Sequence, residues 1–316
     1  MPADRRGWDA HTHLVPATVT DAARRGEYDM ALDDGHLLTP MLRFPTGRIT
    51  DPEALVAWLD DNHLEGAVVS PPPPLYRPDL DDTRVGTWVD LVNGGMAEAC
   101  AHERLRALAY LPAERPGLAA ELAAGLDGSW VGVTLGTDLG GLAYSDPSYR
   151  PVWETLAARG LPAFVHPGHC PDTRLGRFYL TNLVGNPHET TVAAAHLVFG
   201  DVPGRHPDLR VLLAHGGGAV AALVGRWQQG YDTDRPGIET LTLTPREAIR
   251  RFWVDSLVHD PSYLRHVVDT FGPETVVLGS DWPFPMGESS PAIAPGRLPG
   301  RVGDGIRLGG ARLFHL

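Results

Sequence analysis

The sequence contains no lysine, since all 27 of its basic residues are arginine. A Schiff-base mechanism needs a lysine amine, so that class of carbonyl chemistry is excluded. A pair of metal ions bridged by a carboxylated lysine is excluded for the same reason. The two cysteines, Cys100 and Cys170, do not make a disulfide framework. Any metal site in this chain must therefore use other nitrogen and oxygen ligands.

An excess of positive charge is also lacking. The chain has 39 acidic against 27 basic residues, a net charge of −12, which argues against binding to nucleic acids or anionic membranes. No apolar stretch is long enough to span a bilayer, and no apolar signal core follows the first six residues. The 43% of hydrophobic residues is ample for a buried core. We expect a cytoplasmic protein.

Short apolar runs alternate with longer helical stretches along the chain. Most of these runs show no apolar–polar alternation, which favours parallel strands buried on both faces. We expect strands at 8–10, 66–70, 105–110, 131–135, 163–166, 211–215, 252–256 and 276–281. Helices are expected from Asp51 onward and at 83–103, 116–125, 151–159, 188–199, 218–229, 245–251, 261–271 and 305–313.

Eight strands, each followed by a helix, favour a single (β/α)₈ TIM barrel domain over residues 1–316. A doubly wound open sheet is the alternative, because a strand count does not prove that the sheet closes. Residues 16–50, between the first strand and its helix, have a loop-like composition. Long loops after barrel strands are usually functional or disordered, and we expect a long loop insertion there.

Histidines and one aspartate occupy the ends of four expected strands. His11 and His13 follow the first strand, and side chains two residues apart on a strand point to the same face. The fifth and sixth strands end in His166 and His215, and the eighth ends in Asp281. Chemistry in a TIM barrel takes place at the carboxyl ends of the strands. We therefore expect these side chains to meet at one rim.

Three imidazoles and one carboxylate are a ligand set that suits Zn²⁺ with a water at an open position, while Mn²⁺ or Fe²⁺ is also compatible. Such an ion lowers the pKa of its water and polarises a bound carboxylate or carbonyl group. A further histidine must then carry protons near neutral pH. His215 is our choice, because the three glycines that follow it leave room for its ring.

Longer motifs add a family resemblance that covers most of the chain. They are Leu183-Val184-Gly185-Asn186-Pro187 with Glu189-Thr190-Thr191, Ala214 to Gly218 with Val224-Gly225-Arg226, Asp255 with Leu257 to Asp260, and Gly279 to Pro285. The chain resembles the amidohydrolase-2 superfamily, and within it the family of 2-amino-3-carboxymuconate-6-semialdehyde decarboxylases. The resemblance implies a barrel with one divalent metal held by His11, His13, His166 and Asp281. His215 would be the acid/base that hydrogen-bonds the metal-bound water.

Members of this family bind substrate carboxylates with arginines, whose planar guanidinium suits two parallel hydrogen bonds. By the resemblance Arg43 takes one such place, and Arg48 is the alternative if the loop is shifted. Arg226 matches a second arginine, which the family donates across a homodimer interface. Phe284 matches an aromatic residue of the family pocket.

The chain also departs from the family near the expected substrate. The family commonly has His-Pro-Trp-Asp after the fifth strand, whereas here Pro167 is followed by Gly168, His169 and Cys170. Asn182 stands where some relatives have an aromatic residue. We expect His169 and Asn182 to contact the substrate.

These observations predict a non-oxidative decarboxylase that needs no organic cofactor. Its substrate would be an unsaturated or aromatic carboxylic or polycarboxylic acid, and His215, or Asp281 in its protonated form, would supply a proton to the carbon bearing the carboxylate. A hydrolase or hydratase acting on a lactone, amide or alkene is the alternative, because the same ligands would serve it and the fold does not decide the reaction.

Overall fold

Eight parallel strands form the centre of the computed structural model, which describes residues 7–299 and 301–316. The strands follow one another around the sheet in the order β1-β5-β6-β7-β8-β9-β10-β11. Their bounds are Trp8–His13 (β1), Gly66–Ser70 (β5), Leu105–Tyr110 (β6), Gly132–Gly136 (β7), Ala163–His166 (β8), Val211–Leu213 (β9), Phe252–Asp255 (β10) and Val276–Val277 (β11).

Backbone hydrogen bonds join β1 to the segment that continues from β11. The Ala10 N–H donates to the Leu278 carbonyl at 2.8 Å, and the Asp281 N–H donates to the His11 carbonyl at 2.9 Å. The His13 N–H donates to the Trp282 carbonyl at 2.9 Å. The first and last strands are therefore linked, and the predicted TIM barrel is confirmed over the doubly wound alternative.

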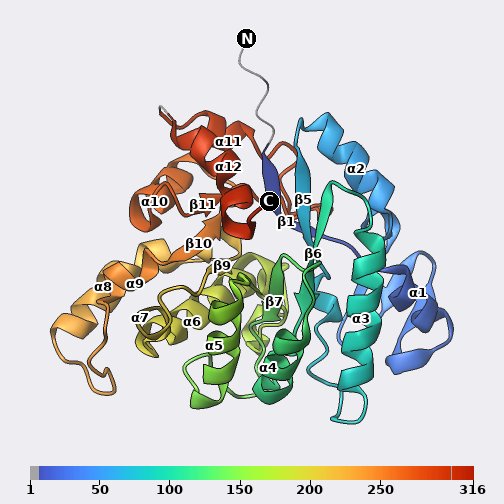
Figure 1. Ribbon diagram of the computed structural model, residues 1–316, viewed down its shortest axis with the longest axis horizontal. Helices are drawn as coiled ribbons and strands as arrows, with labels where there is room; N and C mark the ends of the chain where they lie inside the picture. The colour runs from blue at the N-terminus through green and yellow to red at the C-terminus, as the bar shows by residue number, and fades with distance from the viewer. Residues whose placement is uncertain (1–6, 300) are drawn as a thin grey trace.

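A helix follows each strand and packs on the outside of the barrel (Figure 1). These helices are α2 (Pro52–Asp61), α3 (Val85–Ala99), α4 (Pro116–Gly125), α5 (Arg150–Arg159), α6 (Asn186–Phe199), α8 (Val220–Asp232), α10 (Pro261–Phe271) and α12 (Val302–Phe314). Short helices α7 (Val202–Arg205), α9 (Pro245–Ile249) and α11 (Ile293–Gly296) lie between them. Buried apolar side chains of the strands, such as Val68, Leu108 and Phe164, form a cluster with Leu313 and Phe314 of α12. Two larger clusters include residues of the strands and of the surrounding helices.

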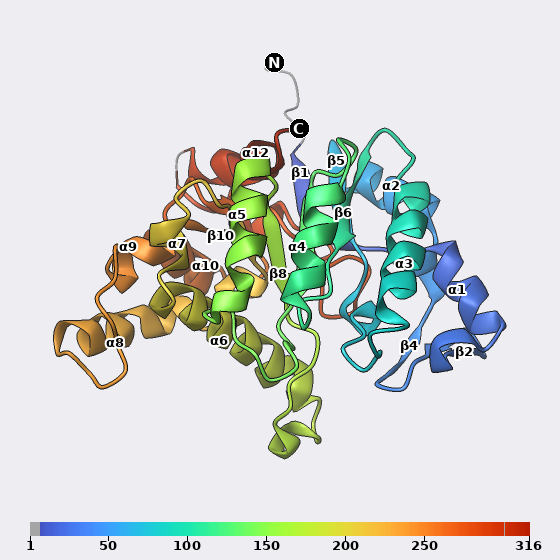
Figure 2. The ribbon, with the colours of Figure 1, turned by 60° about the horizontal axis from the view of Figure 1, so that its bottom comes forward.

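The predicted insertion after β1 is present, and parts of it form regular secondary structure. It contains helix α1 (Ala17–Arg24) and an antiparallel sheet of β2 (Ala31–Asp33), β3 (His36–Leu38) and β4 (Arg43–Pro45) (Figure 2). Asp34 and Gly35 connect β2 to β3 with φ of 44° and 69°, which is the backbone of a tight two-residue hairpin turn. Leu37 and Phe44 are buried in the core, so the insertion is packed against the barrel.

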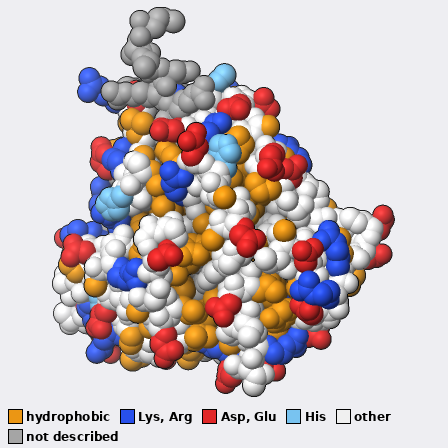
Figure 3. All heavy atoms as spheres, turned by 45° about the vertical axis from the view of Figure 1, so that its right-hand side comes forward, with side chains coloured by type: hydrophobic (Ala, Val, Ile, Leu, Met, Phe, Trp, Pro, Cys, Tyr) orange, Lys and Arg blue, Asp and Glu red, His pale blue; other side chains and the backbone are white. Residues whose placement is uncertain are grey.

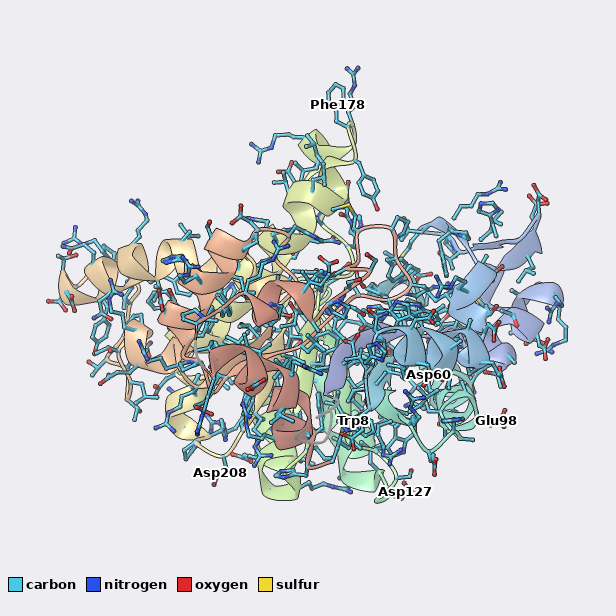
Figure 4. The ribbon with its side chains drawn as sticks, turned by 90° about the horizontal axis from the view of Figure 1, so that it is seen from above. Trp8, Asp60, Glu98, Asp127, Phe178 and Asp208 are labelled. Carbon is cyan, nitrogen blue, oxygen red and sulfur yellow. The ribbon has the colours of Figure 1, made fainter. Side chains whose placement is uncertain are left out.

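A projection formed by the segment between β8 and α6 extends beyond the barrel. Phe178 lies at its tip, on the side of the molecule away from Trp8, where β1 begins (Figure 4). The projection therefore lies on the same side as the carboxyl ends of the strands. Its Phe178 and Tyr179 side chains are 77% and 62% exposed.

Charged side chains of both signs are interspersed over the face shown in Figure 3, with hydrophobic side chains between them. This face therefore carries no extended basic patch of the kind that binds a nucleic acid. Within the described residues, no helix combines the length and apolar character needed to cross a membrane.

Candidate metal centre

Four buried side chains at the carboxyl end of the barrel could together hold one metal ion. One ligand atom from each of His11, His13, His166 and Asp281 lies within 4.8 Å of all the others. The two histidines of β1 point to the same side, as predicted, and their Nε2 atoms are 3.2 Å apart. Asp281 Oδ1 lies 3.1 Å from His13 Nε2 and 3.4 Å from His11 Nε2.

The donor atoms of this cluster fit a cation. His166 Nε2 and Asp281 Oδ1 are buried and have no hydrogen-bond partner among the described residues. Buried polar atoms without partners cost free energy, and a metal bound between them would remove that cost. Burial lowers the pKa of His11, but its hydrogen bond to Asp255 and the nearby Asp281 outweigh this effect and raise the pKa to about 10. Without a metal the cluster thus holds a proton, which a bound metal would displace.

The opposite ring nitrogen of each histidine has a hydrogen-bond partner that fixes its orientation. His11 Nδ1 lies 2.8 Å from Asp255 Oδ2, and His13 Nδ1 lies 3.0 Å from Ser70 Oγ. His166 Nδ1 donates to the Pro167 carbonyl at 2.9 Å. These partners leave all three Nε2 atoms available as ligands, which is the usual arrangement around a bound metal.

Asp255, at the end of β10, is a residue whose role the sequence did not reveal. Its carboxylate contacts His11 and accepts hydrogen bonds from the backbone N–H groups of His215 and Gly216 at 2.9 Å and of Leu257 at 3.1 Å. It is completely buried. Asp255 therefore fixes the position of the His11 ring relative to the backbone of His215. The sequence comparison included Asp255 in a family motif but gave no sign of these contacts.

His215 lies beside the cluster, just beyond the end of β9. Its Nε2 is 4.0 Å from Asp281 Oδ2, and its φ of 56° is unusual for a residue with a side chain. Gly218 follows with a φ of 64°, and a Cβ there would lie 2.3 Å from the Pro187 carbonyl oxygen. Burial, together with the charge of His11, lowers the pKa of His215 to about 4. The ring is therefore neutral at pH 7.

A cavity of about 640 Å³ opens beside the cluster and contains most of the predicted substrate residues. Besides His166, His215 and Asp281, its lining includes the predicted residues Arg43, His169, Asn182 and Phe284. The Phe284 ring lies 5.4 Å from the ring of His13. A smaller cavity of about 300 Å³ shares Asn182, His215 and Asp281 with the first.

Two of the predicted arginines lie outside the cavity lining as far as the structure describes it. The Arg48 guanidinium lies 5.4 Å from the centre of the Trp282 ring. Arg226 is exposed on α8. Of the two alternatives in the insertion, Arg43 lines the cavity. Its side chain is 51% exposed, and its Nη1 lies 3.7 Å from Asp33 Oδ2.

The sequence pattern of the amidohydrolase family matches residues 8–298. The chain belongs to this family. It is 39% identical over 170 residues to 2-amino-3-carboxymuconate-6-semialdehyde decarboxylase of Dictyostelium discoideum, a match that covers 53% of this chain and 46% of that protein. The chain thus spans about half the length of this relative.

Solved structures of decarboxylases share the fold. The 5-carboxyvanillate decarboxylase of Sphingomonas paucimobilis superimposes with a TM-score of 0.83 at 24% identity, over 98% of this chain and 99% of that one. A dihydroxybenzoic acid decarboxylase of Polaromonas, which holds manganese and the inhibitor 2-nitroresorcinol, superimposes with a TM-score of 0.80 at 21% identity, over 98% and 97% of the two chains. At these identities the likeness shows the barrel fold.

Proposed function

We propose that the chain is a metal-dependent, non-oxidative decarboxylase of an unsaturated or aromatic carboxylic acid. The observation that carries the proposal is the cluster of His11, His13, His166 and Asp281 beside His215 at the wall of a cavity large enough for a small aromatic acid. The relatives and structural neighbours named above are decarboxylases, which supports this choice.

His11, His13, His166 and Asp281 would hold a single divalent cation. A cation there would supply attraction for the substrate carboxylate and would stabilise negative charge that develops during the reaction. Three imidazoles and a carboxylate suit Zn²⁺, which is our first expectation. Mn²⁺ is the second, because the related Polaromonas structure contains it.

His215 would deliver the proton on which the reaction depends. We infer that its Nε2, which faces Asp281 Oδ2 at 4.0 Å, takes a proton from solvent and transfers it to the carbon that bears the carboxylate. The bond between that carbon and the carboxylate then breaks, its electron pair restores the conjugated system, and CO₂ leaves. One proton is consumed for each CO₂ released, and no electron acceptor is needed. Protonated Asp281 is the other candidate donor, although the effect of its burial is outweighed by hydrogen bonds with His11 and His13, which hold its pKa well below the usual range.

The remaining cavity residues would hold and orient the acid. Arg43 can bind a carboxylate with its guanidinium, Phe284 can cover one face of an unsaturated or aromatic group, and His169 and Asn182 can hydrogen-bond its polar substituents. Placement of the substrate against His215 would lower the barrier by fixing the distance for proton transfer.

We further propose that the chain acts in the cytoplasm as a homodimer in which Arg226 reaches the cavity of the partner subunit. Exposure of Arg226 on α8 is compatible with such a role, and the exposed apolar side chains of the projection offer surface for a subunit contact. Light scattering should give the mass of two chains, and Arg226→Ala should raise KM without changing that mass. A monomeric active protein would overturn this part.

The test of the function is CO₂ release under nitrogen by protein loaded with Zn²⁺ or Mn²⁺, using a panel of hydroxybenzoic and unsaturated acids. We expect release of CO₂ with one solvent deuteron incorporated into each product molecule in D₂O. No release from the panel, together with hydrolysis of a lactone, amide or ester and uptake of ¹⁸O from labelled water, would instead support the hydrolase alternative.

A further inference from the structure

The part of the cavity wall that follows β6 and β7 is acidic. Glu114 lies in the loop after β6 and Asp138 in the loop after β7, and both line the 640 Å³ cavity. In the order of strands around the barrel, β6 lies two strands from β1, which carries His11 and His13, and two strands from β8, which carries His166. The cavity wall therefore carries two carboxylates, Glu114 and Asp138, in addition to the metal-binding side chains of His166 and Asp281.

Glu114 is a largely buried carboxylate whose acceptor positions are not all used within the protein. Its side chain is only 7% exposed, and its Oε1 accepts a hydrogen bond from Arg115 Nη1 at 2.7 Å. The backbone N–H of Glu114 itself adds a second hydrogen bond, and because a carboxylate has about four acceptor positions, some remain free. Because Glu114 lines the cavity, a ligand there can donate to one of these free acceptor positions.

The charge of Glu114 is only partly neutralised. Arg115 shares its guanidinium between Glu114, Asp82 at 2.9 Å and the Leu80 carbonyl. Burial raises the pKa of Glu114, and the nearby charge of Asp138 adds to this effect. A hydrogen-bond donor brought into the cavity would replace the water that this carboxylate has lost, whereas another carboxylate would be repelled.

We propose that Glu114 is a specificity-determining residue that accepts a hydrogen bond from a hydroxyl or amino group of the substrate, at a position other than the reacting carboxylate. This inference rests on the proposed function, since it assumes that the reacting carboxylate lies at the metal cluster. The preferred substrates are then hydroxy- or amino-substituted acids, and a second carboxylate is accepted beside Arg43 but rejected beside Glu114.

Nitrobenzenes provide unreactive probes, because the nitro group has the shape of the reacting carboxylate but cannot lose CO₂. The probes carry hydroxyl, amino, carboxylate or hydrogen at the meta or para position, and their binding to manganese-loaded protein is measured by calorimetry at a pH where the phenol is neutral. We expect the hydroxyl or amino probe to bind at least about tenfold more tightly than nitrobenzene, and the carboxylate probe to bind most weakly.

Glu114→Gln should reverse this ranking. The glutamine oxygen will face Arg115, so its amide NH₂ will face the cavity and turn an acceptor into a donor. The preference for the hydroxyl or amino probe should fall at least about tenfold, and the carboxylate probe should bind more tightly than it does to the unmodified protein. Glu121→Gln, at an exposed position on α4, is the matched control and should keep the original ranking. Glu114→Ala is a second test, in which the preference for the hydroxyl or amino probe should be lost but not reversed.

The results separate this inference from the proposed function. An unchanged ranking in both Glu114 variants, or a preference of the unmodified protein for the carboxylate probe, would overturn the role of Glu114. A preference for only one of the hydroxyl and amino probes, lost in the variants, supports the role and identifies the donor. The predicted probe ranking without CO₂ release from the matching acids would reject decarboxylation and leave the role of Glu114 standing.

Discussion

Substitution of Asp255 by asparagine should weaken metal binding without removing any metal ligand. Oδ2 of Asp255 contacts His11 Nδ1 and the His215 N–H, while Oδ1 accepts from the N–H groups of Gly216 and Leu257. An asparagine has one oxygen and one NH₂ group. Whichever way it turns, two of the four donors then face another donor.

The size of the effect follows from these contacts. A hydrogen bond to a charged group contributes about 1.5–3 kcal/mol, so two lost contacts should lower the unfolding free energy of the metal-free protein by about 3–6 kcal/mol. If the oxygen keeps His11, the turn around Gly216 is disrupted; if it keeps Gly216, His11 loses the partner that orients its Nε2. Loss of such a partner typically weakens metal binding by about 10- to 100-fold.

Competition with a chromophoric chelator would measure the affinity for Mn²⁺ or Zn²⁺, and urea unfolding of the chelated protein would measure stability. Asp51→Asn is the matched control, because Asp51 caps α2 by accepting from the Ala54 N–H at 3.1 Å and asparagine caps helices equally well. Metal affinity of Asp255→Asn equal to that of the control would refute the positioning role of Asp255.

Four further outcomes follow from the same structure. His215→Ala should reduce the rate of CO₂ release by about 10²- to 10⁴-fold while atomic absorption finds the same metal content, and an unaltered rate would remove His215 from the mechanism. Ser70→Ala should weaken metal binding about tenfold in the chelator assay, because His13 loses its 3.0 Å partner. Gly218→Ala should lower the unfolding free energy in urea by about 3 kcal/mol, because its Cβ would overlap Pro187 and its φ is positive. Divalent metal at 100 times its Kd should stabilise the protein by about 2.7 kcal/mol, which for 316 residues raises the melting temperature by about 4 °C. This rise in melting temperature should affect one cooperative unfolding transition if residues 1–316 form one domain.

The barrel and its metal cluster were predictable because both depend on short-range patterns. Continuous apolar runs mark buried parallel strands, and a histidine or aspartate at a strand end must project at the carboxyl rim once the barrel closes. The ends of two strands differ from the expected ones. The first strand extends to His13, and the last strand, β11, ends at Val277, so Asp281 lies in the following loop. The ligands nevertheless meet, because the loop after β11 is hydrogen-bonded to β1.

Other features depend on contacts that one sequence does not reveal. The pair Asp34-Gly35 is a hairpin signal, but the strands beside it have only three residues each and their burial comes from packing on the barrel. The choice between Arg43 and Arg48 depended on the path of that insertion. Asp255 acts through backbone N–H groups about 40 positions away, and no spacing rule identifies such acceptors.

The most direct test of the central claim is a metal titration of the chelated protein with CO₂ release as the readout. The rate should be negligible without metal, rise in proportion to added Mn²⁺ or Zn²⁺, and reach its plateau at one ion per chain. His166→Ala should stay inactive throughout the titration. A rate that is independent of metal, or a plateau at two ions per chain, would contradict a mononuclear centre built from His11, His13, His166 and Asp281.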